Sequence, residues 1–363
     1  MKVAIIGLPK SGKTTIFNTL TKGNAEVTAY SASLSSNVGI ARVPDTRLDT
    51  LSNAFHPKKT TPAEVNYVDI GGSLKQMGNK GEMSGELLNY LTTADALLQV
   101  VRLFTDEQIP HPEGSIDAER DIGTMDMELA FSDLAIIERR LNKIGSALKG
   151  AKSPERENYQ KEQVLLKKIK IGLDQDIPIR QQKLDATELK ALSHYQFLTA
   201  KPMLVAINIG ENQLPAAEGT EEKLLDSHPE FAFIALCGKL EMELSQLDES
   251  SAVEFRETMG LTESALGRVI QSTYKLLGLC SFFTTGPDEV KAWTITQGLL
   301  AQQAAGKVHS DIERGFIRAE VLSYKDFIEC GSFNEAKRKG LLRTEGKTYV
   351  VQDGDIINYL FNI

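Results

Sequence analysis

A short run of residues near the start of the chain carries the clearest chemical signal. Gly7 to Thr14 read Gly-Leu-Pro-Lys-Ser-Gly-Lys-Thr, which fits the pattern G-x-x-x-x-G-K-[ST]. The two glycines let the backbone wrap closely around an anion, with its N–H groups pointing inward. Lys13 would supply a positive charge to the β- and γ-phosphates of a nucleotide, and the Thr14 hydroxyl would reach Mg²⁺. The pattern therefore predicts a phosphate-binding loop.

A second phosphate motif, Asp69-Ile70-Gly71-Gly72, follows roughly 55 residues later, at the end of an alternating apolar segment. Asp69 could hold Mg²⁺ through water, and the Gly72 N–H could contact the γ-phosphate. The pair of motifs favours a switch-type triphosphatase over a P-loop small-molecule kinase. Ser73 stands where Ras-like enzymes place a glutamine that orients the attacking water. Serine is too short for that role, so hydrolysis must use another group or a bound cation, or be slow.

A third motif, Asn208-Ile209-Gly210-Glu211, stands where GTPases usually carry N-K-x-D. In those proteins the aspartate accepts two hydrogen bonds from guanine. Glu211 is one methylene longer, so its carboxylate falls off-register with the guanine donors. The motif weakens strict guanine selection, and adenine can then compete.

Near-continuous apolar segments predict the sheet that positions these motifs. Residues 2–6, 64–68, 96–103, 202–209 and 231–236 are expected to be strands, and residues 14–20 a helix. Buried strands that alternate with helical segments indicate a parallel α/β sheet.

The stretch from 117 to 200 interrupts this alternation with two heptad-like seams. One helix is predicted before residue 149 and another after residue 154, with a short polar break between them. Two readings stay open, a projecting antiparallel coiled-coil arm and two helices packed flat on the sheet. The seam positions are Ala130, Leu134, Ile137, Leu141, Ile144 and Leu148 in the first helix, and Tyr159, Leu166, Ile169 and Leu173 in the second.

From residue 281 onward the pattern predicts a small α+β domain. Residues 315–322 and 348–352 are strand-like, Asp353-Gly354 is a turn signal, and residues 356–361 are apolar. A chain of 363 residues is expected to form two or three domains.

Composition bounds the class of protein. The net charge is −8, and its acidity lies in residues 201–280, where 6 basic residues face 13 acidic ones. No segment has the positive excess of a dedicated nucleic-acid binder, and no apolar run approaches a membrane span. The three cysteines, Cys237, Cys280 and Cys330, show no metal-ligand spacing. These features predict a cytoplasmic protein with reduced thiols.

Taken together, the motifs resemble those of the YchF-type Obg-like ATPases over essentially the whole chain. The most specific stretches lie near the C-terminus, where they are similar to the TGS domain that closes this family. The resemblance implies a Ras-like P-loop NTPase domain (1–116 and 201–280), an α-helical coiled-coil insertion (117–200) and a C-terminal β-grasp TGS domain (281–363). Its carriers are Gly7-Leu8-Pro9, Asn37-Val38-Gly39, Val43-Pro44-Asp45, Asp69-Ile70-x-Gly72, Asn208-x-x-Glu211, residues 291–295, 304–309 and 315–319, and Asp353-Gly354-Asp355.

The resemblance also implies an activity and partners. These are binding of ATP and GTP with Mg²⁺, often with ATP favoured, slow hydrolysis, and association with the ribosome, its large subunit or RNA, through the arm and the TGS domain. A monomer without a membrane partner is expected. The expected metal ligands are Thr14, Ser33 and Asp69. The expected nucleotide contacts are Leu8, Pro9, Lys10, Ser11, Gly12, Lys13, Thr14, Thr15, Gly72, Asn208, Ile209, Glu211, Cys237 and Gly238.

The chain departs from the family pattern at several of these positions, which points to a divergent paralogue. Lys10-Ser11 stands where the family has Asn-Val, and that asparagine is associated with a potassium site in related GTPases. We hypothesise that the Lys10 ammonium occupies the position of the potassium ion. Ser33 aligns with a switch threonine and keeps a hydroxyl for Mg²⁺. The loop Cys237-Gly238-Lys239 is only loosely similar to the family's.

The Pro-bracketed His111 aligns with the histidine proposed as catalytic in the family. A neutral imidazole could position or deprotonate water, and the alternative is an ordinary loop histidine. The basic residues Lys161, Lys167, Lys168 and Lys170 are either a solvated helix face or a contact to an RNA backbone. For the whole protein, the alternative to a slow triphosphatase is a nucleotide-gated binding module with negligible hydrolysis.

Overall fold

The computed structural model describes residues 1–21, 37–70, 85–150, 152–261 and 263–362. The chain forms two compact units. One comprises Met1–Gly39 and Asn66–Leu266, and the other comprises Ile40–Val65 and Gly267–Ile363. Residues 40–65 therefore group with the C-terminal part of the chain, which the expected boundaries at 116 and 281 did not anticipate.

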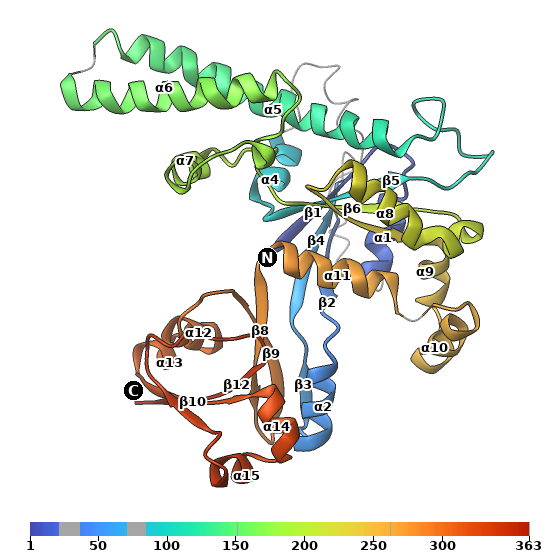
Figure 1. Cartoon of the computed structure of the whole chain (residues 1–363), viewed down its shortest axis with the longest axis vertical. Helices are drawn as coiled ribbons and strands as arrows, with labels where there is room; N and C mark the ends of the chain where they lie inside the picture. Colours follow the sequence, from blue (N-terminus) through green and yellow to red (C-terminus); the bar gives the residue numbers. More distant parts are fainter. Residues whose placement is uncertain (22–36, 71–84, 151, 262, 363) are drawn as a thin grey trace. The chain divides into compact units, whose positions relative to one another are not determined.

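The first unit is built on a six-stranded sheet in the order β2-β4-β1-β5-β6-β7 (Figure 1). The pairs β1–β4, β1–β5, β5–β6 and β6–β7 are all parallel, so the predicted parallel α/β sheet is confirmed. The predicted strands agree with the observed ones to within one residue at each end, whereas β2 had not been predicted. The strands are β1 (Lys2–Ile6), β2 (Asn37–Arg42), β4 (Glu64–Asp69), β5 (Ala96–Arg102), β6 (Met203–Asn208) and β7 (Ala232–Leu236).

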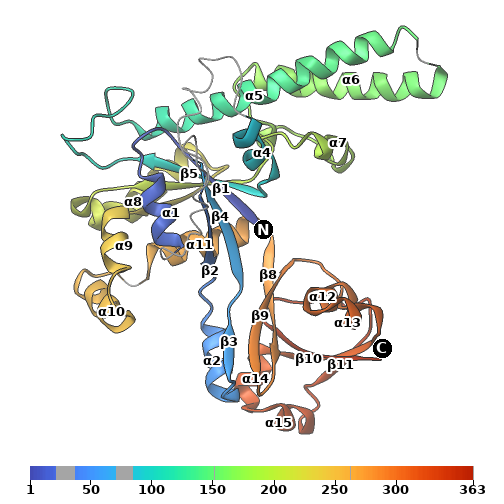
Figure 2. The same cartoon turned by 180° about the vertical axis from the view of Figure 1, so that it is seen from behind.

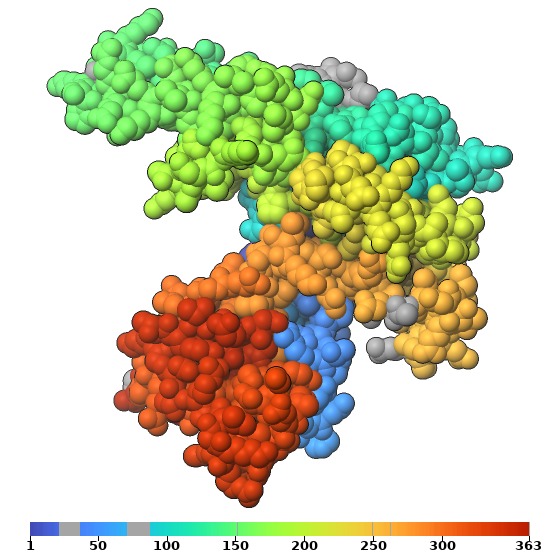
Figure 3. Space-filling view, in the orientation of Figure 1, coloured from blue at the N-terminus to red at the C-terminus, as the bar shows by residue number. Residues whose placement is uncertain are grey.

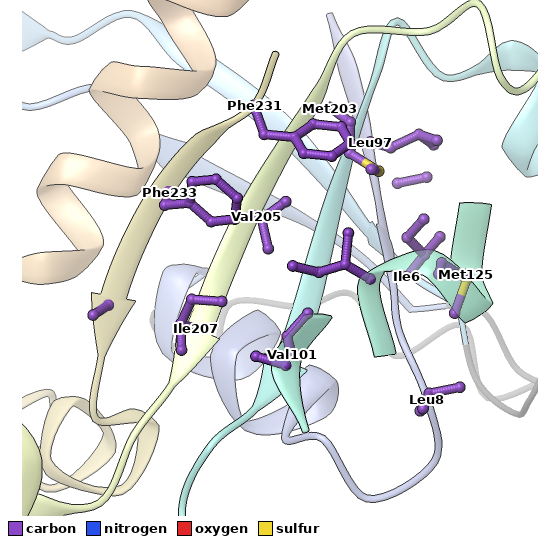
Figure 4. Close-up of a cluster of buried hydrophobic side chains, with 14 of the residues drawn as sticks. Ile6, Leu8, Leu97, Val101, Met125, Met203, Val205, Ile207, Phe231 and Phe233 are labelled. Carbon is purple, nitrogen blue, oxygen red and sulfur yellow. The ribbon is translucent and has the colours of Figure 1, made fainter. Parts of the chain in front are cut away.

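A large hydrophobic core covers one face of this sheet. Figure 4 shows side chains of β5 and β6, among them Val101 and Val205, in one cluster that also contains Met125 of the long helix α5. Burying such apolar surface is the main favourable term in folding the unit. The helices of the unit are α1 (Lys13–Leu20), α4 (Gly85–Thr93), α5 (Ala118–Ala147), α6 (Ser153–Leu173), α7 (Ala186–Leu192), α8 (Ala217–Ser227), α9 (Gly238–Leu244) and α10 (Glu249–Thr258), and α11 (Ala265–Leu276) begins at its end.

Helices α5 and α6 form a helical pair that extends beyond the sheet, and both views and the space-filling surface show this projection (Figures 1, 2 and 3). Ile137 and Ile144 of α5 and Leu166 and Ile169 of α6 are fully buried in one cluster. The remaining predicted seam positions are buried or half-buried in the same cluster, so the predicted seams form the hydrophobic core of the helical pair, which Phe197 and Leu192 of the following segment complete.

A buried carboxylate fastens α5 to the segment that returns the chain to the sheet. Asp133 is fully buried and accepts hydrogen bonds from the backbone N–H groups of Leu198 and Thr199, at 2.9 and 2.8 Å. The Thr199 hydroxyl donates a third, at 2.6 Å. Burial raises the pKa of Asp133 to about 6, against the opposing effect of these hydrogen bonds.

The second unit holds a mixed sheet in the order β11-β10-β12-β8-β9-β3. Residues 348–352, predicted to be a strand, make only an isolated bridge between Val350 and Leu300, so that prediction is wrong. The predicted α+β character of the C-terminal region is confirmed. The elements are α2 (Thr46–Phe55), β3 (Lys59–Thr61), β8 (Leu279–Thr285), β9 (Glu289–Thr296), α12 (Ala301–Val308), α13 (Ser310–Arg314), β10 (Phe316–Ser323), α14 (Tyr324–Cys330), α15 (Phe333–Arg338), β11 (Arg343–Glu345) and β12 (Asp355–Phe361).

The Asp353-Gly354-Asp355 motif holds this second unit together. The Asp353 carboxylate accepts from the backbone N–H of Ser281 at 2.9 Å and from Arg47 at 2.7 Å. Arg47 also binds Asp45, whose side chain caps α2. Gly354 has a φ of 88°, a conformation that favours glycine. The contacts of Asp353 and the backbone conformation of Gly354 therefore give these residues a structural role within the second unit.

Candidate functional site

The predicted phosphate-binding loop joins β1 to α1, and its glycines are required by close packing. Gly7 has a φ of 147°, and a Cβ there would lie 2.3 Å from the carbonyl oxygen of Val100 in β5. Gly12, with a φ of 97°, caps α1, and a Cβ there would lie 2.2 Å from the Asn208 side chain. The loop is thus held against β5 and β6, where any larger residue would displace it.

Lys13 lies at the centre of this loop with its side chain buried. Its ammonium donates to the carbonyl oxygens of Gly7 and Leu8, both at 2.9 Å. Burial lowers the pKa of Lys13, and the nearby Asp69 carboxylate opposes that effect. A buried cation whose partners are neutral carbonyls is suited to receive an anion, because an anion would stabilise its charged form.

The Thr14 hydroxyl donates to Oδ2 of Asp69 at 2.8 Å, which joins the loop to the end of β4. The other carboxylate oxygen, Oδ1, is buried and has no hydrogen-bond partner among the described residues. Burial raises the pKa of Asp69, while Thr14 and Lys13 oppose that shift. A hydroxyl and a carboxylate with a free oxygen are the oxygen ligands that Mg²⁺ prefers, so these two residues fit the expected metal.

The remaining loop residues are placed unequally. Leu8 is buried in the hydrophobic core, so only its backbone can face a ligand. Ser11 is buried and its hydroxyl has no partner among the described residues. Pro9 and Thr15 are half-buried, and Lys10 is exposed with a φ of 65°.

The base motif is tied to the phosphate-binding loop by Asn208. Its side-chain amide donates to the carbonyl oxygen of Ser11 at 2.9 Å, and its carbonyl oxygen accepts from the backbone N–H of Gly238 at 3.0 Å. Asn208 therefore joins three loops at the carboxyl end of the sheet. Ile209 follows it with its side chain buried in the core, so only its backbone could meet a base.

Glu211 is the other predicted base contact, and its side chain is 46% exposed. Its carboxylate lies 3.1 Å from the ammonium of Lys239, which follows Gly238 at the start of α9. Cys237, at the N-cap of α9, is buried, and burial raises the pKa of its thiol. The structure thus brings the predicted residues of both base-side loops together.

Two predicted ligands, Ser33 and Gly72, lie outside the described residues, as does Ser73. Their expected contacts with Mg²⁺ and the γ-phosphate stay predictions.

His111 is engaged on both sides of its ring. Its Nε2 lies 2.9 Å from Oδ2 of Asp121, and its Nδ1 accepts from the backbone N–H of Glu113 at 3.2 Å. The side chain is 4% exposed, and Arg120 also binds the Asp121 carboxylate. The neutral ring therefore carries its proton on Nε2. His111 would have to leave one of these partners to activate water, and its catalytic role stays a prediction.

The basic cluster on α6 is largely neutralised by ion pairs. Lys161 lies 2.7 Å from Glu157, Lys168 lies 2.7 Å from Glu188, and Lys170 lies 2.9 Å from Glu138. These pairings match a solvated helix face. The RNA contact stays a prediction.

Arg102 and Phe104, at the end of β5, were not singled out from the sequence. Phe104 donates its backbone N–H to the carbonyl oxygen of Asn208 at 3.0 Å. The buried guanidinium of Arg102 lies 4.4 Å from the centre of the Phe104 ring and donates to the Phe104 carbonyl oxygen at 3.1 Å. The available signal in the sequence was a charged residue at the end of an otherwise uncharged strand.

A glycine loop that leads from a parallel strand into a helix, with an aspartate from the adjacent strand bonded to the loop's threonine, is the arrangement of P-loop nucleotide-binding proteins. The chain has the fold of that class. Comparison with known proteins then narrows the class to a family.

A family model described as a 50S ribosome-binding GTPase matches residues 2–135, and the model YchF-GTPase_C, described as a protein of unknown function, matches residues 279–362. The chain is 37% identical to the ribosome-binding ATPase YchF of Bacillus subtilis, with 100% of both chains covered. It is 38% identical to the protein of the same name from Haemophilus influenzae, covering 100% of this chain and 99% of the relative. The solved YchF GTPase of Schizosaccharomyces pombe matches with a TM-score of 0.85 at 30% identity, covering 99% and 97% of the two chains. The chain belongs to the YchF family.

Among the helices of the described residues, none combines the length and apolar character needed to span a bilayer.

Proposed function

We propose that this chain binds and slowly hydrolyses ATP, GTP or both with Mg²⁺, and that it acts as a ribosome-associated switch in the cytoplasm. Two features of the phosphate-binding loop carry the proposal. The Lys13 ammonium is buried at its centre, and the Thr14 hydroxyl is hydrogen-bonded to the Asp69 carboxylate. Relatives named ribosome-binding ATPases, which match over the full length, support the activity and the ribosomal partner.

Four residues at the site, two in the loop and two outside it, would have distinct roles in nucleotide binding. Lys13 would exchange its two carbonyl partners for phosphate oxygens, and the backbone N–H groups between Gly7 and Thr14 would bind the same anion. Thr14 and Asp69 would hold Mg²⁺, which when bound neutralises charge on the phosphates. Asn208 would keep the phosphate-binding loop and the base-side loops in register.

The rest of the chain would supply the partner contacts. The helical pair within residues 117–200 and the C-terminal region 281–363, which we propose to be a TGS domain, would contact the large ribosomal subunit. Residues 1–116 and 201–280 would form the nucleotide-binding domain of a monomer.

Phosphate release from ATP and from GTP, measured on the purified full chain with Mg²⁺ or with a chelator, tests the activity. Lys13→Ala should abolish release, because it removes the cation from the loop. Lys58→Ala, an exposed lysine paired with Asp288, is the matched control and should leave release unchanged. Release that persists with the chelator or in Lys13→Ala would refute the proposed site.

A binding module without significant hydrolysis is the second candidate, and the engagement of both His111 nitrogens favours it. Nucleotide binding measured by calorimetry separates the two. Tight binding without release above that of Lys13→Ala would establish the module. Co-sedimentation with 50S subunits in ATP, in ADP and without nucleotide tests the switch, and equal binding in all three would refute it.

A further inference from the structure

The two base-side loops are joined at two points, one buried and one exposed. The buried point is the hydrogen bond from the Gly238 N–H to the Asn208 side chain, at 3.0 Å. The exposed point is the ion pair between Glu211 and Lys239, at 3.1 Å. Because Asn208 also binds the phosphate-binding loop, the buried bond fixes both loops relative to the nucleotide site.

Charged groups around Lys239 identify Glu211 as its main partner. The ammonium lies 3.1 Å from Glu211 and 4.0 Å from Glu243, one turn further along α9. Both Glu211 and Lys239 are substantially exposed, at 46% and 69% of their side chains. An exposed pair of this kind adds little to the free energy of unfolding. Its larger effect would be on the hydrogen bonds that the Glu211 carboxylate can offer to a bound base.

The two purine bases differ in what they present to a carboxylate at this edge. Guanine offers two donors, its N1–H and its 2-amino group, which a free carboxylate can accept together. Adenine has an acceptor at N1 and no amino group at C2. A carboxylate already paired with an ammonium has less acceptor capacity for guanine. The ammonium is itself a donor, and it can donate a hydrogen bond to adenine N1.

We propose that Lys239 is a specificity-determining residue that biases the site toward adenine nucleotides by occupying the Glu211 carboxylate. This inference rests on the proposed nucleotide-binding function and deepens it. Lys239 acts partly through Glu211, so removing the ammonium frees the carboxylate for guanine and removes a donor available to adenine.

Binding of non-hydrolysable analogues of ATP, GTP and ITP to the full chain, with Mg²⁺ present, measures this bias. Lys239→Ala should lower the ratio of the GTP-analogue Kd to the ATP-analogue Kd about tenfold, the effect expected from one charge-assisted hydrogen bond. Inosine keeps the N1–H but lacks the 2-amino group. A smaller gain in affinity for the ITP analogue than for the GTP analogue would therefore show that the freed carboxylate also accepts from the 2-amino group. Lys239→Arg should keep the wild-type ratio, because the cation is kept. Lys58→Ala, which breaks a more exposed ion pair elsewhere, should also keep the wild-type ratio.

The coupling to Glu211 has its own readout. In a Glu211→Gln background, Lys239→Ala should no longer tighten binding of the GTP analogue, because no carboxylate remains to be freed. If the wild-type chain binds none of the analogues, the proposed function fails and this inference with it. If it binds them but the ratio is the same in Lys239→Ala, only the role of Lys239 is refuted.

Discussion

Replacing Asn208 with alanine should both destabilise the first unit and weaken nucleotide binding. Asn208 is 5% exposed, and its side chain makes two hydrogen bonds to backbone groups, the carbonyl of Ser11 and the N–H of Gly238. Alanine would leave both backbone groups without a partner. A buried polar group left unpaired costs about 1–3 kcal/mol, so with two such groups the free energy of unfolding should fall by roughly 2–6 kcal/mol.

For a unit of about 240 residues, each kcal/mol lowers the Tm by about 2–4 °C, so a decrease of roughly 4–24 °C is expected. Thermal unfolding followed by circular dichroism measures the decrease. Asn142→Ala, at an exposed position of α5, is the matched control and should leave the Tm within about 1–2 °C of wild type, because surface substitutions change stability little. Equal melting temperatures for the two variants would refute the view that Asn208 holds the loops together.

Asn208→Asp separates the two hydrogen bonds. The introduced carboxylate can still accept from Gly238, but it places a negative oxygen against the carbonyl oxygen of Ser11. Protonation of that carboxyl group restores a donor. The deficit in Tm relative to wild type should therefore shrink as the pH falls, and a deficit independent of pH would show that the bond to Ser11 contributes nothing.

Three further outcomes follow from the structure. Asp133, with a pKa raised to about 6 from an ordinary value of 3.8, keeps its proton in the folded chain over a range where the unfolded chain has lost it. The contribution of Asp133 to the free energy of unfolding is therefore fully present below pH 3.8, and roughly 3 kcal/mol of it is lost as the pH rises through about 6. Urea unfolding of the wild-type chain should show this decrease, and urea unfolding of Asp133→Asn should not. If the Lys10 ammonium replaces a potassium ion, phosphate release should be the same in potassium and sodium chloride, and strong activation by potassium would refute the replacement. If His111 activates water despite its partners, His111→Ala should lower phosphate release without changing nucleotide affinity, and equal rates would remove it from the mechanism.

The sheet and the phosphate-binding loop could be predicted because their determinants are contiguous in sequence. Residues 3–6 form a buried apolar run that leads directly into the glycine pattern, and β5 and β6 are buried throughout and mostly apolar. Strand β2 was not predicted, because its large apolar residues, Val38 and Ile40, are exposed and its buried positions hold the small residues Gly39 and Ala41, so no buried apolar stripe marks it in the sequence. Residues 348–352 have strand-forming residues, but Val350 makes only one bridge, since strand formation depends on a partner that the local sequence does not specify.

Long-range pairings were beyond the sequence for a related reason. Asp133 meets Thr199 across 66 residues, and Arg47 meets Asp353 across 306. Aspartate, threonine and arginine are all common on protein surfaces, so the residue types alone gave no sign of these contacts. Similarly, His111 could be noted from its proline-bracketed loop, whereas its pairing with Asp121 requires the turn that brings the loop back onto the start of α5.

Base selection shows how a motif considered alone can mislead. The sequence argument rested on the extra methylene of Glu211, yet the structure places Lys239 beside that carboxylate from a loop 28 residues further on. Shortening the side chain by Glu211→Asp would restore the N-x-x-D spacing but leave a cation next to it. We therefore expect Glu211→Asp alone to gain little affinity for the GTP analogue, and Glu211→Asp combined with Lys239→Ala to gain more than the two single changes together. Binding measurements on the four proteins of this cycle decide the matter. A full gain from Glu211→Asp alone would mean that side-chain length, and not the ion pair, limits guanine binding.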